Sequence, residues 1–254
     1  MNSTMYTNVH LVRNTMIAPM LQTERLRRIY KMSKVALLGD SIIDNKVYVG
    51  PGEFSVLEHI ESLSDLEFSQ IALDGDTTVE VLYNQLEKLE ETSDFNVLSI
   101  GGNDLLEHLH LLVDPINKNT FSRNLEIMNE FIEPIKERYE KIVEYLSKKE
   151  GKLLLCTVYN GDFERDDGHE TFEGDEGFIF GIGDLLKGKQ EAATVIARVF
   201  NDVVYSTGKK FGVDVLELRE IFTDSIDYAN PIEPSHVGGG KLAENILKWI
   251  KSHD

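Results

Sequence analysis

Five short apolar runs, separated by longer amphipathic segments, constrain the fold of this chain more than any other feature. Each run is brief and bounded by turn residues, as buried strands are. The runs cover 35–38, 68–73, 95–100, 152–159 and 213–218. Between them, apolar residues recur at helical spacing, most clearly over 53–63, 120–146 and 190–211. Strands that alternate with helices form parallel sheets with helices on both faces, so we expect an α/β fold with a mostly parallel five-stranded sheet.

The chain of 254 residues suits one such domain, which we place at 32–254. The preceding segment, 1–31, carries five basic residues against one acidic residue and has no apolar core of a secretory signal. We expect it to be a disordered tail or the product of a start codon placed too early. An organelle transit peptide is the alternative, because such peptides are also rich in arginine and poor in acidic residues.

Charge and cysteine content narrow the partners and the compartment. The formal charge of −18, from 26 basic and 44 acidic residues, argues against nucleic acid or an anionic membrane as a partner. No apolar segment is long enough to span a bilayer. The single cysteine, Cys156, lies in an apolar run, where we expect it to be buried. One thiol cannot form an internal disulfide, so we expect a reducing, cytoplasmic location.

Three of the predicted strands end in polar turns that contain glycine. These turns are Gly39–Ser41, Asp74–Asp76 and Gly101–Asp104, and a late loop adds His236. Because the carboxyl ends of parallel strands meet at one edge of a sheet, we expect these groups to converge there. Together they offer the hydroxyl of Ser41, backbone N–H donors, a side-chain amide and a base. Acyl transfer needs such a set, because an activated hydroxyl attacks and preorganised donors stabilise the oxyanion.

These turns resemble sequence blocks of the SGNH (GDSL) hydrolase superfamily. The matching segments are Gly39–Ile42, Gly75, Gly101–Asp104, Pro234–Gly238 and Lys241–Ala243. The resemblance implies a flavodoxin-like three-layer α/β/α sandwich and an esterase or lipase that forms an acyl-enzyme without a cofactor. It also implies that Ser41 is the nucleophile and that the Ser41 N–H, the Gly75 N–H and the Asn103 amide form the oxyanion hole. An α/β-hydrolase is less well supported, because the chain has no Gly-x-Ser-x-Gly elbow.

The last block departs from the Asp-x-x-His-Pro pattern of that superfamily, and two alignments remain open. Spacing by chemistry makes Glu233 the orienting acid and His236 the base, but no proline follows the histidine. Spacing by the flanking residues puts Glu233 at the histidine position and Asn230 at the aspartate position. Glu233 could then act as the base if burial raised its pKa. His236 is alternatively a surface residue at the start of a helix.

Several further expectations concern the surroundings of this site. Asp40 and Asp104 are expected to orient turns through backbone N–H groups, and the aspartates fit no calcium loop, so we assign no metal. The acidic, glycine-rich segment 160–183 is a candidate lid, and Pro134 should kink or divide its helix. The substrate is a small-molecule or glycan ester, left open between a lipid, a glycan acetyl ester and a thioester. The alternative function is a catalytically silent binding protein that has lost its base, and the oligomeric state stays open.

Overall fold

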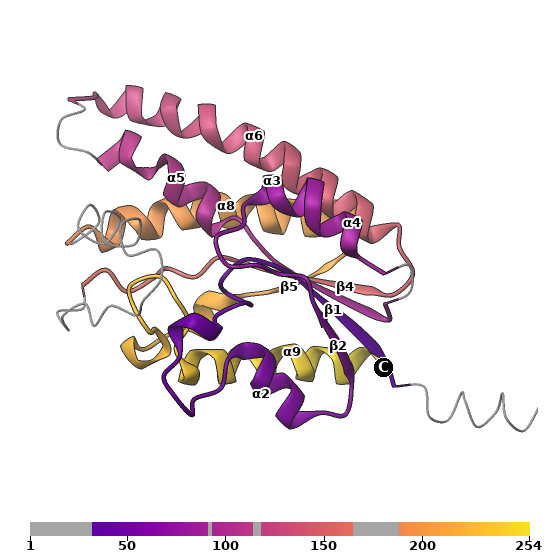
Figure 1. Ribbon diagram of the computed structural model, residues 1–254. Helices are drawn as coiled ribbons and strands as arrows, with labels where there is room; N and C mark the ends of the chain where they lie inside the picture. Colours follow the sequence, from indigo (N-terminus) through magenta and orange to yellow (C-terminus); the bar gives the residue numbers. More distant parts are fainter. Residues whose placement is uncertain (1–31, 91–92, 114–117, 165–187) are drawn as a thin grey trace, which may run out of the picture. The chain divides into compact units, whose positions relative to one another are not determined.

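The computed structural model describes residues 32–90, 93–113, 118–164 and 188–254 (Figure 1). Two of the sequence expectations therefore fall outside the described residues. These are the extension at 1–31 and most of the candidate lid at 160–183. Within the chain, Lys34–Asp254 forms one compact unit.

A five-stranded sheet with the order β2-β1-β3-β4-β5 runs through this unit, and every neighbouring pair of strands is parallel. The strands are β1 (Lys34–Gly39), β2 (Glu67–Gln70), β3 (Phe95–Ser99), β4 (Lys152–Cys156) and β5 (Asp214–Leu216). All five predicted strands are present, and the expected α/β class is confirmed. The chain goes from β1 outward to β2 and then returns to the other side of β1. This reversal lies between β1 and β3, where open sheets of this kind bind ligands beyond the strand ends.

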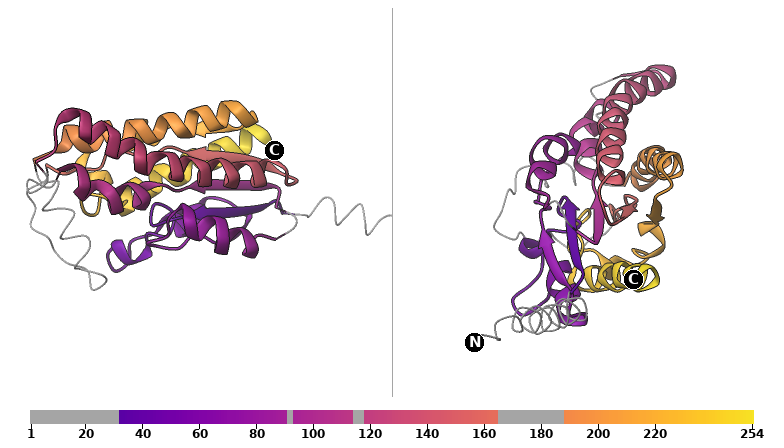
Figure 2. Two further views of the ribbon diagram at one scale, coloured as in Figure 1. Left: turned by 90° about the horizontal axis from the view of Figure 1, so that it is seen from above. Right: turned by 90° about the vertical axis from the view of Figure 1, so that its right-hand side faces the viewer.

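Helices cover both faces of the sheet (Figures 1 and 2). One face carries α2 (Val56–Leu63) and α9 (His236–His253). The other carries α5 (Gly102–Val113), α6 (Phe121–Ser147), α8 (Gln190–Phe211) and the continuous helical stretch α3 (Thr78–Glu80), η2 (Val81–Gln85) and α4 (Leu86–Lys88). Short 3₁₀ turns occupy η1 (Lys46–Tyr48), η3 (Leu218–Glu220) and η4 (Ser225–Asp227). The expected three-layer sandwich is therefore confirmed.

The alternation of side chains along β1 divides the core into two clusters. Val35 and Leu37 pack with residues of α2 and α9, whereas Ala36 and Leu38 pack with residues of α5, α6 and α8. Successive side chains of a strand point to opposite faces, so each apolar run feeds both helical layers. Cys156 is buried and free, as expected.

Two helices differ from the sequence expectation. The last helix begins at His236 rather than near Gly239, because the Ser235 hydroxyl caps it by accepting from the N–H groups of residues 237 and 238. The helix that contains Pro134 is not divided, since α6 is continuous from residue 121 to residue 147. A proline in a helix interior costs about 3 kcal/mol. Burial of the helix face around it, including Phe131 and Ile135, offsets that cost.

Candidate active site

The turn after β1 presents Ser41 at the carboxyl edge of the sheet. Gly39 has a φ of +139°, and a Cβ at this position would lie 1.8 Å from the Ser99 carbonyl oxygen. Only glycine therefore lets β1 approach β3 this closely. The next peptide is held by a hydrogen bond from Asp40 N to Ser99 O at 3.2 Å. Asp40 Oδ1 accepts from Ile42 N at 3.1 Å, which is the turn-orienting role expected of this aspartate.

Gln85 joins this turn to the loop after β2, and the sequence analysis did not single it out. Its Oε1 accepts from Gly39 N at 2.9 Å, and its Nε2 donates to Gly39 O and to Asp76 Oδ2, both at 2.7 Å. The side chain is buried, and Gln85 is the last residue of the π-helical turn η2. Such turns are frequent at functional sites. The available signal was a polar residue between Val81 and Leu86, on the buried face of a helical pattern.

Two of the three expected oxyanion donors, Gly75 and Asn103, lie in the loop after β2 and in the first turn of α5. Asn103 Nδ2 donates to Asp76 O at 3.0 Å, and an amide group has a second hydrogen to donate. Gly75 has a φ of +83°, in a turn closed by a hydrogen bond from Asp76 N to Leu73 O. Asn103 lines the same pocket as Ser41, whereas Gly75 is not among the described residues that line it.

Asp104 ties the start of α5 to the start of α3. Its carboxylate accepts from Thr78 N at 2.8 Å and from Thr78 Oγ1 at 2.6 Å. Arg138 Nη2 of α6 reaches the same carboxylate at 3.2 Å. The expectation that Asp104 orients a turn through a backbone N–H is confirmed. These contacts fix the helix end that carries Asn103.

Glu233 is the base candidate that lies beside Ser41. It is 3% exposed and lines the same pocket. Burial raises the pKa of its carboxyl well above the ordinary value, and the charges of Asp74 and Asp40 act in the same direction. The neighbouring Ser41 side chain lowers that pKa. One carboxyl oxygen, Oε2, is buried with no hydrogen-bond partner among the described residues.

The backbone around Glu233 is shaped by Asn230. Asn230 Oδ1 accepts from Ile232 N at 2.9 Å and from Glu233 N at 3.0 Å. Asn230 therefore holds the peptide that presents Glu233, rather than its carboxyl group. Asp40, the residue before the serine, is a second buried carboxyl. Desolvation by burial raises its pKa to about 8.

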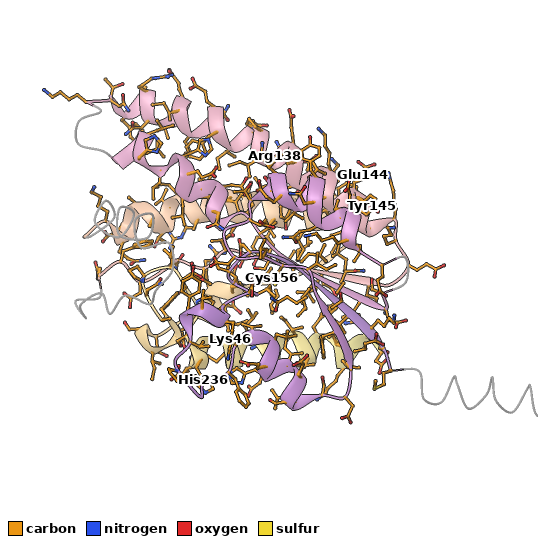
Figure 3. All side chains as sticks on the ribbon, viewed as in Figure 1. Lys46, Arg138, Glu144, Tyr145, Cys156 and His236 are labelled. Atoms are coloured by element: carbon orange, nitrogen blue, oxygen red, sulfur yellow. The ribbon has the colours of Figure 1, made fainter. Side chains whose placement is uncertain are left out.

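His236 points to a different neighbour. Its Nδ1 lies 2.9 Å from Phe54 N and 3.1 Å from His59 Nε2, in front of α2. It is not among the described residues that line the pocket with Ser41. Figure 3 shows it in the layer of α2 and α9, away from Cys156 at the end of β4. The structure brings Ser41, Asn103 and Glu233 together and leaves His236 at the start of α9.

The pocket beside Ser41 contains about 610 Å³ of unfilled space, part of it open to solvent. Its polar wall includes Asp40, Ser41, Asn103 and Glu233. The rest is largely apolar and comes mainly from α5, the segment after β4 and α8. Elsewhere, the described residues hold no group of three or more His, Cys, Asp or Glu side chains suited to a metal ion. Within the same residues, no helix has the length and apolar character needed to cross a membrane.

Solved structures with this architecture include several ester hydrolases. An extracellular lipase from Streptomyces rimosus is 15% identical, with a TM-score of 0.60 over 85% of this chain and 98% of that chain. A phospholipase A1 from Streptomyces albidoflavus is 16% identical, with a TM-score of 0.60 over 85% and 99%. An acetylxylan esterase from Geobacillus stearothermophilus is 14% identical, with a TM-score of 0.52 over 85% and 93%.

The fold is that of known ester hydrolases. Protein-family models and curated protein sequences give no match to this chain. At these levels of identity the likeness concerns the fold, which agrees with the fold implied by the sequence resemblance. The chemistry therefore has to be argued from the site itself.

Proposed function

We propose that this chain is a serine ester hydrolase of SGNH (GDSL) type in which Glu233 is the general base. The observation that carries the proposal is the shared pocket of Ser41, Asn103 and Glu233, in which a buried carboxyl lies beside the serine. A hydroxyl next to a base and a side-chain amide donor is the set that acyl transfer requires. The shared architecture with lipases and esterases supports the same class of reaction.

In the proposed mechanism, Ser41 Oγ attacks the ester carbonyl carbon while ionised Glu233 accepts the hydroxyl proton. The carbonyl oxygen becomes an oxyanion that accepts from the N–H groups of Ser41 and Gly75 and from Asn103 Nδ2. The bond to the leaving alkoxide then breaks, and Glu233 returns the proton to it. Water releases the acyl group from Ser41 by the same steps, again with Glu233 as the base.

Glu233 stands in this proposal where related chemistry uses an imidazole. A structure described as a catalytic mutant of the Geobacillus esterase replaces a histidine with alanine. In this chain, the ring of His236 has the backbone N–H of Phe54, just before α2, and the side chain of His59 in α2 as its partners. A carboxylate can replace the imidazole only if its pKa is raised toward the working pH, which burial of Glu233 supplies.

The test is covalent labelling with a fluorophosphonate, together with turnover of p-nitrophenyl esters at mildly alkaline pH. We expect labelling and turnover in the wild type and neither in Ser41→Ala. A folded wild-type protein that is unlabelled and inactive at every pH would overturn the proposal.

One observation favours the alternative, a silent binding protein. The raised pKa of Glu233 keeps its carboxyl protonated at pH values where an ordinary glutamate is ionised, and a protonated group cannot act as a base. This alternative predicts ligand binding that Ser41→Ala leaves unchanged. Hydrolysis that disappears in Ser41→Ala would rule it out.

A further inference from the structure

The lining of the pocket divides into a polar wall and an apolar remainder. The polar wall holds the proposed reacting groups, Ser41, Asn103 and Glu233. The apolar remainder is contributed by leucine, isoleucine, valine, phenylalanine and alanine side chains from separate parts of the chain. Burial of hydrocarbon in such a lining is favourable by about 0.8 kcal/mol per methylene. The pocket is therefore a place where a hydrocarbon chain gains free energy beside the nucleophile.

The apolar lining begins at the oxyanion donor. Leu105, Leu106 and Leu109 follow Asn103 on the same helix, and all line the pocket. The helix α8 also contributes to the lining, through Ile196 and two alanines. A carbonyl oxygen held by Asn103 would leave the chain attached to that carbonyl carbon next to the leucines. We propose that the pocket binds the hydrocarbon chain of the acyl group, so that the substrate is a medium-chain fatty acyl ester or thioester.

A sugar fits this lining poorly. Outside the polar wall, the polar side chains are those of Tyr159, whose hydroxyl already donates to Ile232 O, and Asn160. The Asn160 Oδ1 is buried with no hydrogen-bond partner among the described residues. One amide group cannot pair with the several hydroxyl groups that a sugar ring brings. Each hydroxyl buried without a partner costs about 1–3 kcal/mol. The lining therefore favours an acyl chain over a glycan that carries an acetyl ester.

This inference rests on the proposed function, and the first experiment varies the acyl chain alone. For p-nitrophenyl esters from acetate to hexanoate, we expect kcat/KM to rise about fourfold per methylene, or about two orders of magnitude in total. A parallel series of alkyl acetates varies the alcohol instead, and we expect a much weaker dependence. Ser41-dependent turnover that is fastest with acetate, or a dependence on the alcohol chain, would overturn the inference and leave the proposed function standing.

A matched pair of variants on α8 tests where the hydrocarbon chain of the substrate binds. Ala197 lines the pocket, whereas Ala192, on the same helix, is half-buried and not among the residues that line it. We expect Ala197→Leu to lower kcat/KM for hexanoate at least tenfold and for acetate less than threefold, since the added methyl groups shorten the space for the chain. Ala192→Leu should keep the wild-type profile. Equal losses on both esters in Ala197→Leu would argue against a chain in this pocket.

A binding measurement keeps the inference testable if no ester is hydrolysed. We expect octanamide to bind Ser41→Ala at least tenfold more tightly than acetamide does in titration calorimetry, and Ala197→Leu to remove that preference in the same background. Absence of turnover with chain-dependent binding would overturn the proposed function alone. Absence of a preference for octanamide would overturn the acyl-chain inference.

Discussion

Around Ser41, the turn after β1 and the loop after β2 are joined by hydrogen bonds, while the segment 230–236 brings a buried carboxyl with an unpaired oxygen. On the first side, Gln85 satisfies Gly39 and Asp76, and Asn103 bonds to the same loop. On the second side, Glu233 Oε2 has no partner among the described residues. The comparison teaches that the proposed donors are positioned by preorganised contacts, whereas the proposed base is tuned by desolvation.

The largest expected effect follows from substitution of the proposed base, Glu233. Glu233→Gln keeps the size of the side chain but cannot accept the proton of Ser41. We expect kcat at saturating substrate to fall by about 10²–10⁴-fold, the range for loss of a general base. His236→Ala should change kcat less than about threefold, because that ring contacts α2. A large loss in folded His236→Ala, with activity retained in Glu233→Gln, would assign the base to the histidine.

The pH dependence of kcat/KM in the wild type tests the role of Glu233 without a mutation. Glu233 must be ionised to act, and burial raises its pKa well above 4.5. We therefore expect kcat/KM to rise about tenfold per pH unit until that raised pKa is reached. Rates should be corrected for spontaneous hydrolysis at each pH. A plateau that already begins near the ordinary pKa of glutamate would show that Glu233 is not the group that limits the reaction.

The donor side is tested by Gln85→Met, which keeps the volume and removes three hydrogen bonds. It leaves Gly39 and the Asp76 carboxylate without these partners. The turn after β1 and the loop after β2 are then no longer joined by the Gln85 side chain. We expect kcat to fall by about tenfold to a hundredfold with little change in KM, because a small misplacement of reacting groups has a large effect on rate.

A destabilised variant outside the site serves as the control for Gln85→Met. Ile135→Ala on α6 removes fully buried apolar volume and should cost about 2–5 kcal/mol of unfolding free energy. If Ile135→Ala lowers kcat as much as Gln85→Met does at equal stability, then Gln85 acts through stability and is not a positioning residue.

The difference between the two sides also explains what the sequence could predict. The turn after β1 was predictable because it depends on local features, a bounded apolar run followed by Gly39 and Ser41. The surroundings of His236 were not predictable, because its partners lie far away in the sequence. They are Phe54, just before α2, and His59, within α2. Local spacing could not choose between the two alignments of the last block. Burial of Glu233 against Ser41 favours the alignment by flanking residues.

Gln85 and Pro134 also show what helical spacing in the sequence cannot predict. The partners of Gln85 lie on two loops, and a π-helical turn directs the side chain toward them. Period analysis assumes a regular helix and cannot anticipate such a turn. Pro134 was expected to kink or divide its helix from the loss of a backbone hydrogen bond. Packing of the buried face of α6, which spacing alone cannot quantify, outweighs that loss.

The last expected effect is on stability rather than on rate, and it concerns Asp40, the buried carboxyl in the turn after β1. Its pKa is about 8 in the folded protein against 3.8 as the ordinary value, and desolvation is the main cause. Between these values the folded state keeps a proton that the unfolded state has lost. The folded state therefore binds more protons, so this group makes the free energy of unfolding fall as pH rises from about 4 to about 8 and adds no slope above that.

Asp40→Asn should remove this contribution, because asparagine stays neutral and its Oδ1 can still accept from Ile42 N. Urea unfolding at a series of pH values should give nearly equal stability for wild type and variant near pH 4. Near pH 9 the variant should be more stable, by on the order of a few kcal/mol. Glu233 imposes a slope of the same sign on both proteins, and the charge of Asp40 raises the Glu233 pKa, so the difference between the two curves reports Asp40 together with its coupling to Glu233. Parallel curves over the whole range would mean that Asp40 is ionised in the folded protein, and that the serine lies beside a charged rather than a neutral carboxyl.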